Sequence, residues 1–155
     1  MSYKVEDNWE YKMIGQPMEI KAQNVIKKAY NVDIIETCNN SDYDFKDSNN
    51  VTYEVKADQL SITTGNFFIA YSQKYPFIPE FISAGISKSK ADYHLITYGE
   101  SFYKIKTADI RHILMSDNKG KYLERMFINA RNEYIKGFLL KVEDIKPYAI
   151  IYNCL

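Results

Sequence analysis

The chain has 155 residues, the length of one ordinary domain, so the sequence predicts a single domain over residues 1–155. Hydrophobic residues make up 46% of the chain and aromatic residues 15%, which supplies a packed core and argues against wholesale disorder. The 20 Lys and Arg balance the 20 Asp and Glu. This zero net charge argues against a dedicated nucleic-acid binder, although it is compatible with a local basic strip.

The sequence also predicts the compartment. No apolar stretch reaches membrane-spanning length, and the first ten residues lack the apolar core of a signal peptide. Cys38 and Cys154 match no zinc-binding spacing and are predicted to be reduced thiols. We therefore expect a cytoplasmic protein that has no membrane contact.

The first third of the chain contains a predicted arm, a helix and a strand. Residues 1–17 are polar and aromatic, which indicates an arm or a short first helix. In residues 18–30 apolar side chains recur at intervals of three and four, which predicts a helix. Residues 32–36 are β-branched and apolar and predict a strand, which the polar stretch 38–41 ends.

A β-hairpin follows. Residues 42–45 and 51–56 both alternate in polarity, as strands with one buried face do. Between them, residues 47–50 are Asp, Ser, Asn and Asn, whose short polar side chains bond to their own backbone in turns. This is the clearest local signal in the sequence.

The remainder of the chain interleaves predicted strands and helices. Residues 74–90 contain two prolines and a glycine and are predicted to be irregular. Thr107 is a predicted N-cap. The interleaving indicates an α/β or α+β class with a central mixed β-sheet flanked by helices. The predicted elements are strands at 67–71, 92–97, 102–106 and 138–142, an edge strand at 148–152, and helices at 107–115 and 121–131.

The predicted hairpin gathers charged side chains. Because strand side chains alternate faces, Glu54 and Lys56 share one face, and Asp42 and Asp44 share a face of the partner strand. Pairing across the turn brings Asp44 within one residue of Glu54. Two close carboxylates repel each other, and a Mg²⁺ ion would resolve the conflict while the lysine orients or deprotonates an attacking water. The pattern is therefore compatible with a phosphodiesterase site.

Two alternatives remain open at this level. Exposed hairpin faces commonly carry Glu and Lys as cross-strand ion pairs, so the same spacing is also typical of a solvated surface. Strand parity does not separate Asp42 from Asp44 as the partner of Glu54.

Four sequence blocks, taken in order, resemble a known group of enzymes. The blocks are DYDF at 42–45, YEVKAD at 53–58, TGNFFI at 64–69, and AGI at 84–86 followed by KADY at 90–93. With these blocks the chain resembles, over about residues 18–98, phage and bacterial members of the PD-(D/E)XK nuclease superfamily. The resemblance implies a restriction-endonuclease-like fold and a nuclease that depends on Mg²⁺, with Mn²⁺ as a substitute.

The resemblance assigns roles to the hairpin residues. It implies that Asp44 is the central metal ligand, that Glu54 is the second, and that Lys56 is the lysine of the signature. The carbonyl of Val55, between the last two, would be an additional metal ligand.

Members of this superfamily often add an acid from the first helix. Glu19 fits best and Glu10 is the runner-up, although the helix N-terminal dipole also favours a carboxylate at Glu19. The chain departs from related sequences at Ala70, where they usually carry a glutamate that would strengthen metal binding. Gln73, on the same stretch, is a candidate substitute.

Other polar residues have weaker predicted roles. Lys88 and Lys90 suit phosphate contacts of a nucleic acid, although ordinary surface lysines have the same pattern. Asp92 is predicted to hold its loop by accepting hydrogen bonds from backbone amides. His94 and His112 have no neighbouring metal-binding partner in sequence, so both are predicted to be structural.

The sequence thus supports two functional hypotheses. The first is a Mg²⁺-dependent endonuclease that cleaves DNA, either as a homodimer or by recognising the shape of its substrate. The second is a non-catalytic module of the same fold that binds nucleic acid or a protein, such as a phage-encoded inhibitor. The Ala70 departure and the zero net charge favour the second hypothesis.

Overall fold

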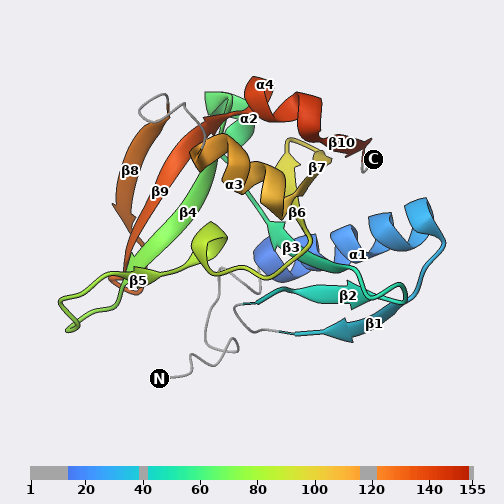
Figure 1. Ribbon diagram of the computed structural model, residues 1–155, viewed down its shortest axis with the longest axis horizontal. Helices are drawn as coiled ribbons and strands as arrows, with labels where there is room; N and C mark the ends of the chain where they lie inside the picture. The colour runs from blue at the N-terminus through green and yellow to red at the C-terminus, as the bar shows by residue number, and fades with distance from the viewer. Residues whose placement is uncertain (1–13, 39–41, 116–121, 154–155) are drawn as a thin grey trace.

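Two β-sheets and the helices around them form the molecule. The structure, a computed structural model, describes residues 14–38, 42–115 and 122–153 (Figure 1). A six-stranded mixed sheet has the order β1-β2-β3-β6-β7-β10, and a four-stranded antiparallel sheet has the order β5-β4-β9-β8. The predicted mixed sheet with flanking helices is confirmed, whereas the second sheet was not predicted.

The elements have the following bounds. The helices are α1 (Gln16–Tyr30), α2 (Ser61–Thr64), α3 (Thr107–Met115) and α4 (Val142–Ile145), with 3₁₀ turns at Gly85–Ser87 and Lys146–Tyr148. The strands are β1 (Ile34–Thr37), β2 (Phe45–Asp47), β3 (Thr52–Lys56), β4 (Asn66–Lys74), β5 (Ile82–Ser83), β6 (Tyr93–Tyr98), β7 (Ser101–Lys106), β8 (Leu123–Ile128), β9 (Tyr134–Lys141) and β10 (Ile150–Asn153). Among the described residues, no helix combines the length and the apolar character needed to cross a membrane.

Helix α1 covers one face of the six-stranded sheet (Figure 1). Pro17 lies in its first turn, where no N–H donor is needed, and Asn31 caps its C-terminal end in a left-handed conformation. Its buried residues Ala22 and Ile26 lie one turn apart, as the predicted helical spacing requires. They pack on a cluster that also contains Val32, Phe45, Tyr53, Leu95 and Phe102.

The opposite face of the six-stranded sheet packs against helix α3 and the four-stranded sheet. Leu95 belongs to the cluster under α1, and its neighbour Ile96 belongs to the second cluster, because successive strand residues face opposite ways. The second cluster also contains Phe67, Ile69, Ile86, Tyr103, Ile105, Ile110, Ile113, Tyr122, Leu140, Val142 and Ile145. The charged residues Glu54 and Lys56, on the opposite side of β3 from Tyr53, therefore face away from α1.

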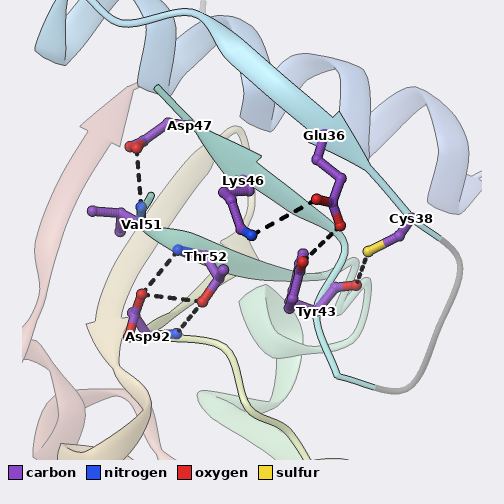
Figure 2. A network of polar contacts seen from close by, with 8 residues as sticks. All are labelled: Glu36, Cys38, Tyr43, Lys46, Asp47, Val51, Thr52 and Asp92. Carbon is purple, nitrogen blue, oxygen red and sulfur yellow. Dashed lines mark hydrogen bonds and ion pairs between the residues drawn. The ribbon is translucent and has the colours of Figure 1, made fainter. Parts of the chain in front are cut away.

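A polar network fixes the predicted hairpin (Figure 2). The hairpin is confirmed, with Phe45 opposite Tyr53 and with Asn50 at a φ of 64° in the turn. Its first strand is wrong in its bounds, because β2 covers 45–47 rather than 42–45 and so includes Asp47, which was assigned to the turn. Asp92 Oδ2 accepts hydrogen bonds from the backbone N–H of Thr52 at 2.9 Å and from its hydroxyl at 3.1 Å. The predicted role of Asp92 as an acceptor of backbone bonds is thereby confirmed, and this bond ties β3 to the start of β6.

Replacing Asp92 with Ala is expected to destabilise the fold by about 2 kcal/mol, because a buried N–H and a hydroxyl would lose a charged acceptor. Urea denaturation followed by circular dichroism measures the change. Asp33→Ala is the matched control, because Asp33 is exposed as Asp92 is, but it bonds to Ser48 through its backbone rather than its carboxylate. An equal loss of stability in both variants would contradict the proposed role of Asp92.

The predicted helix at 121–131 is wrong. Residues 123–128 form strand β8, which pairs with β9 in antiparallel register from Leu123↔Leu139 to Ile128↔Tyr134. Leu, Glu, Arg and Met favour helices locally, but pairing with a neighbouring strand overrides this preference. The predicted strand at 138–142 begins earlier, at Tyr134, because it pairs along the whole of β4, and Val142 instead begins α4.

Candidate active site

The hairpin brings the two predicted carboxylates and the lysine together. Asp44 immediately precedes β2, and its backbone N–H bonds to the Tyr53 carbonyl at 2.8 Å. Its Oδ2 accepts a hydrogen bond from the Val55 N–H at 2.7 Å, so the carboxylate continues the β2–β3 ladder where the strands diverge. On the next residue along β3, Lys56 Nζ lies 2.7 Å from Glu54 Oε1.

The surroundings of Asp44 disfavour its charged form. Burial is the main cause that raises the pKa of Asp44, to about 8, and the negative charges of Glu54 and Glu19 raise it further. Lys56 and the Val55 N–H act in the opposite direction but do not compensate. In the absence of a cation, Asp44 therefore holds a proton at neutral pH.

Glu54 has a buried oxygen without a partner. Its side chain is 13% exposed, and while Oε1 pairs with Lys56, Oε2 is buried with no hydrogen-bond partner among the described residues. An unsatisfied buried carboxylate oxygen carries a substantial desolvation cost. This oxygen is therefore a ready ligand for a cation.

Lys56 is held as an ammonium group. Burial lowers its pKa, but attraction to Glu54, Asp44 and Glu19 outweighs burial and raises the pKa above its usual value. The side chain nevertheless remains 44% exposed. A lysine in this state orients and neutralises anionic groups rather than accepting a proton.

The structure brings Glu19 to the same group of charges but not Asp42. Glu19 lies in the first turn of α1 and acts electrostatically on Asp44 and Lys56. Asp42 instead forms an ion pair with Lys90 at 3.8 Å. The ambiguity left by strand parity is thus resolved geometrically in favour of Asp44. Glu10 and Cys154 lie outside the described residues, and the thiol of Cys38 donates to the Tyr43 carbonyl at 3.0 Å.

The donor set fits a cation that keeps part of its water shell. In the described part of the chain, no group of three or more His, Cys, Asp or Glu side chains is arranged to hold a metal. Mg²⁺ is usually bound through one or two carboxylates together with waters and phosphate oxygens. Asp44 and Glu54 supply the two carboxylates of such a site. The side chain of Val55 packs on the opposite face of β3, against the cluster under α1.

A cleft of about 910 Å³ adjoins Lys56. Lys56 and His94 line it from the six-stranded sheet, and β4, β8 and β9 line it from the four-stranded sheet. Ala70 is among the lining residues. Lys56 therefore connects the acidic group with an open cleft of the size that ligand sites have.

His94 belongs to this site, although sequence reasoning treated it as isolated. It pairs with Glu54 across the parallel β3–β6 ladder, and its Nδ1 lies 2.8 Å from the hydroxyl of Thr107. Burial, and then the positive charges of Lys56 and Arg111, lower its pKa to about 3, so the ring is neutral at physiological pH. The predicted N-cap residue Thr107 thus contacts His94 with its side chain.

The remaining predicted residues lie outside the group. Gln73 donates to Glu133 Oε2 at 2.6 Å, so the hypothesis that it substitutes for the missing acid at Ala70 is not supported. Lys88 is exposed beside the Gly85–Ser87 turn, and Lys90 is 74% exposed next to Asp42. Both lysines are accessible to an anionic partner.

Comparisons with known proteins provide no relative. No family model, no curated protein and no solved structure matches the chain.

Proposed function

We propose that this protein is a divalent-metal-dependent endonuclease that hydrolyses DNA phosphodiester bonds on a restriction-endonuclease-like fold. The observation that carries the proposal is the buried, unpartnered Glu54 Oε2 beside Asp44, whose pKa is raised to about 8. A divalent cation between these carboxylates would give Glu54 Oε2 a partner and would displace the proton of Asp44. Their position next to Lys56, at the edge of the cleft, supports a role in catalysis rather than in stability.

The residues have distinct proposed roles. Asp44 and Glu54 would hold Mg²⁺, or Mn²⁺ in its place, together with the carbonyl of Val55. The bound ion would polarise a phosphoryl oxygen and activate a water. Lys56, as an ammonium group, would bind the scissile phosphate and offset the charge that develops there. Glu19 would position Lys56 and add negative charge around the ion.

The proposed substrate is DNA recognised by shape. A single domain of this size offers little surface for reading a long sequence, which favours homodimerisation or a branched or terminal structure. Lys88 and Lys90 would contact phosphates outside the scissile bond. We further propose that the enzyme acts in the cytoplasm.

The test compares Asp44→Asn with Asp42→Asn, two identical changes on the same stretch of chain. Wild-type protein should bind Mn²⁺ in calorimetry and nick supercoiled plasmid with Mg²⁺. Asp44→Asn should lose most of the binding heat and at least about a hundredfold in cleavage rate. Asp42→Asn should retain both, because Asp42 forms an ion pair with Lys90. Equal effects of the two changes would contradict the proposed site.

The alternative function is a non-catalytic module that binds nucleic acid or a protein. The Lys56–Glu54 ion pair at 2.7 Å and a protonated Asp44 allow the group to balance its charges without a cation, which favours this alternative. Ala70 also leaves the cleft without an acid at that position. Absence of Mn²⁺ binding together with DNA binding but no cleavage would support it.

A further inference from the structure

The wall of the cleft opposite Lys56 is an aromatic surface. Phe68 of β4 and Phe127 of β8 lie with their ring centroids 5.0 Å apart at an interplanar angle of 61°. Ile135 and Leu139 of β9 extend the same wall. Phe127 is 45% exposed, so an aromatic face on an edge strand remains available for stacking.

Two glycines let the chain pack closely behind this wall. A side chain at Gly137 would place its Cβ 2.5 Å from Phe68 Cζ and 2.6 Å from the Ile69 carbonyl oxygen. A side chain at Gly85 would meet the Ala70 carbonyl oxygen at 2.2 Å. The space at both positions is therefore already filled, and Gly137 allows the Phe68 ring to lie directly against the backbone of β9.

The charges around the cleft suit a polyanion. Arg125 of β8 is exposed, and among the described residues its guanidinium contacts only the adjacent Glu124 carbonyl, at 3.5 Å. Asp58 also lines the cleft, but its carboxylate accepts bonds from the N–H groups of Phe68 and Ser61. The guanidinium of Arg125 thus remains available to a phosphate, on the opposite wall from Lys56.

From the aromatic wall, the volume of the cleft and the charges, we infer that the cleft binds an unpaired nucleobase of DNA, stacked on Phe127, with the sugar-phosphate backbone of that nucleotide between Arg125 and Lys56. This inference rests on the proposed function and narrows its substrate class to DNA that contains single-stranded or extruded nucleotides. Base stacking on aromatic side chains is favourable for every base and is not available to a base that stays in a duplex. The cleft is large enough to enclose such a base.

The test measures binding of a 12-nucleotide single strand that carries one 2-aminopurine, first in EDTA and again in CaCl₂. Wild-type protein should quench the fluorescence of 2-aminopurine and should bind the single strand more tightly than the duplex. Phe127→Ala should weaken binding about tenfold and abolish the additional quenching. Arg125→Gln should reduce the slope of affinity against salt by about one.

Met126→Ala is the matched control. Met126 neighbours Phe127 in β8 and is 54% exposed, but it faces away from the cleft, so its loss should change affinity less than twofold. The inference is overturned if Phe127→Ala binds as wild type does, if Met126→Ala is weakened equally, or if the single strand binds no better than the duplex. Since this assay needs no cleavage, single-strand binding through Phe127 without any metal-dependent cutting would refute the proposed function alone. Cutting without such binding would refute the inference alone.

Discussion

Replacing Lys56 with Met is expected to reduce the rate of DNA cleavage by about a hundredfold to a thousandfold, because the substrate phosphate loses its positioned cation. The same change should leave Mn²⁺ affinity unchanged or increase it. The ammonium of Lys56 lies 2.7 Å from Glu54 Oε1 and competes with any metal for that carboxylate. Single-turnover cleavage and calorimetry on the same samples measure the two effects separately.

Two further variants make this result specific. Glu54→Gln should lose both metal binding and cleavage, because it removes the buried anionic oxygen that we propose as a ligand. Lys46→Met is the matched control, since Lys46 forms an ion pair with Glu36 at 3.7 Å on the neighbouring strands and should not affect either measurement. Loss of metal affinity in Lys56→Met would show that the lysine has a structural role in the site.

Replacing the buried His94 is expected to change the free energy of unfolding by an amount that depends on pH. Its pKa is lowered to about 3 in the folded protein, primarily by burial and then by Lys56 and Arg111. In the unfolded chain an imidazole has a pKa of about 6.5. Below pH 6.5 the unfolded chain therefore takes up a proton that the folded protein does not, so the stability that neutral His94 contributes is lost as the pH falls toward 3.

The measurement is the difference in unfolding free energy between wild type and His94→Gln, from urea denaturation in EDTA. The stability advantage of wild type should shrink by about 2 kcal/mol from pH 7 to pH 5. The two proteins are compared because the raised pKa of Asp44 changes the unfolding free energy in the opposite direction over the same pH range. This contribution is present in both proteins and cancels when one unfolding free energy is subtracted from the other. The control is His112→Gln, because His112 is exposed. Its unfolding free energy should differ from that of wild type by the same amount at both pH values. An advantage that does not change with pH would mean that His94 is not a buried neutral ring.

The hairpin shows how far local patterns reach. Alternating polarity in 42–45 and 51–56, joined by four turn-forming residues, was sufficient to predict a hairpin, strand β3 and the approach of Asp44 to Glu54, although β2 lies at 45–47 rather than 42–45. Helix α1 was equally accessible, because its buried residues repeat with the helical period. In both cases the residues that determine the structure are close in sequence, and the turn fixes their register.

The cleft illustrates what local patterns miss. His94 lies beside Glu54 because β3 and β6 pair in parallel, although β4 and β5 come between them in sequence. Strand β8 looks helical by composition and becomes a strand because the edge of β9 is available for pairing. The sequence by itself therefore determined the hairpin, the first helix and the meeting of two carboxylates with a lysine. Only the tertiary structure decided that Asp44 rather than Asp42 joins them, that His94 is adjacent, and that an aromatic cleft opens beside Lys56, because each depends on contacts between segments that no turn connects.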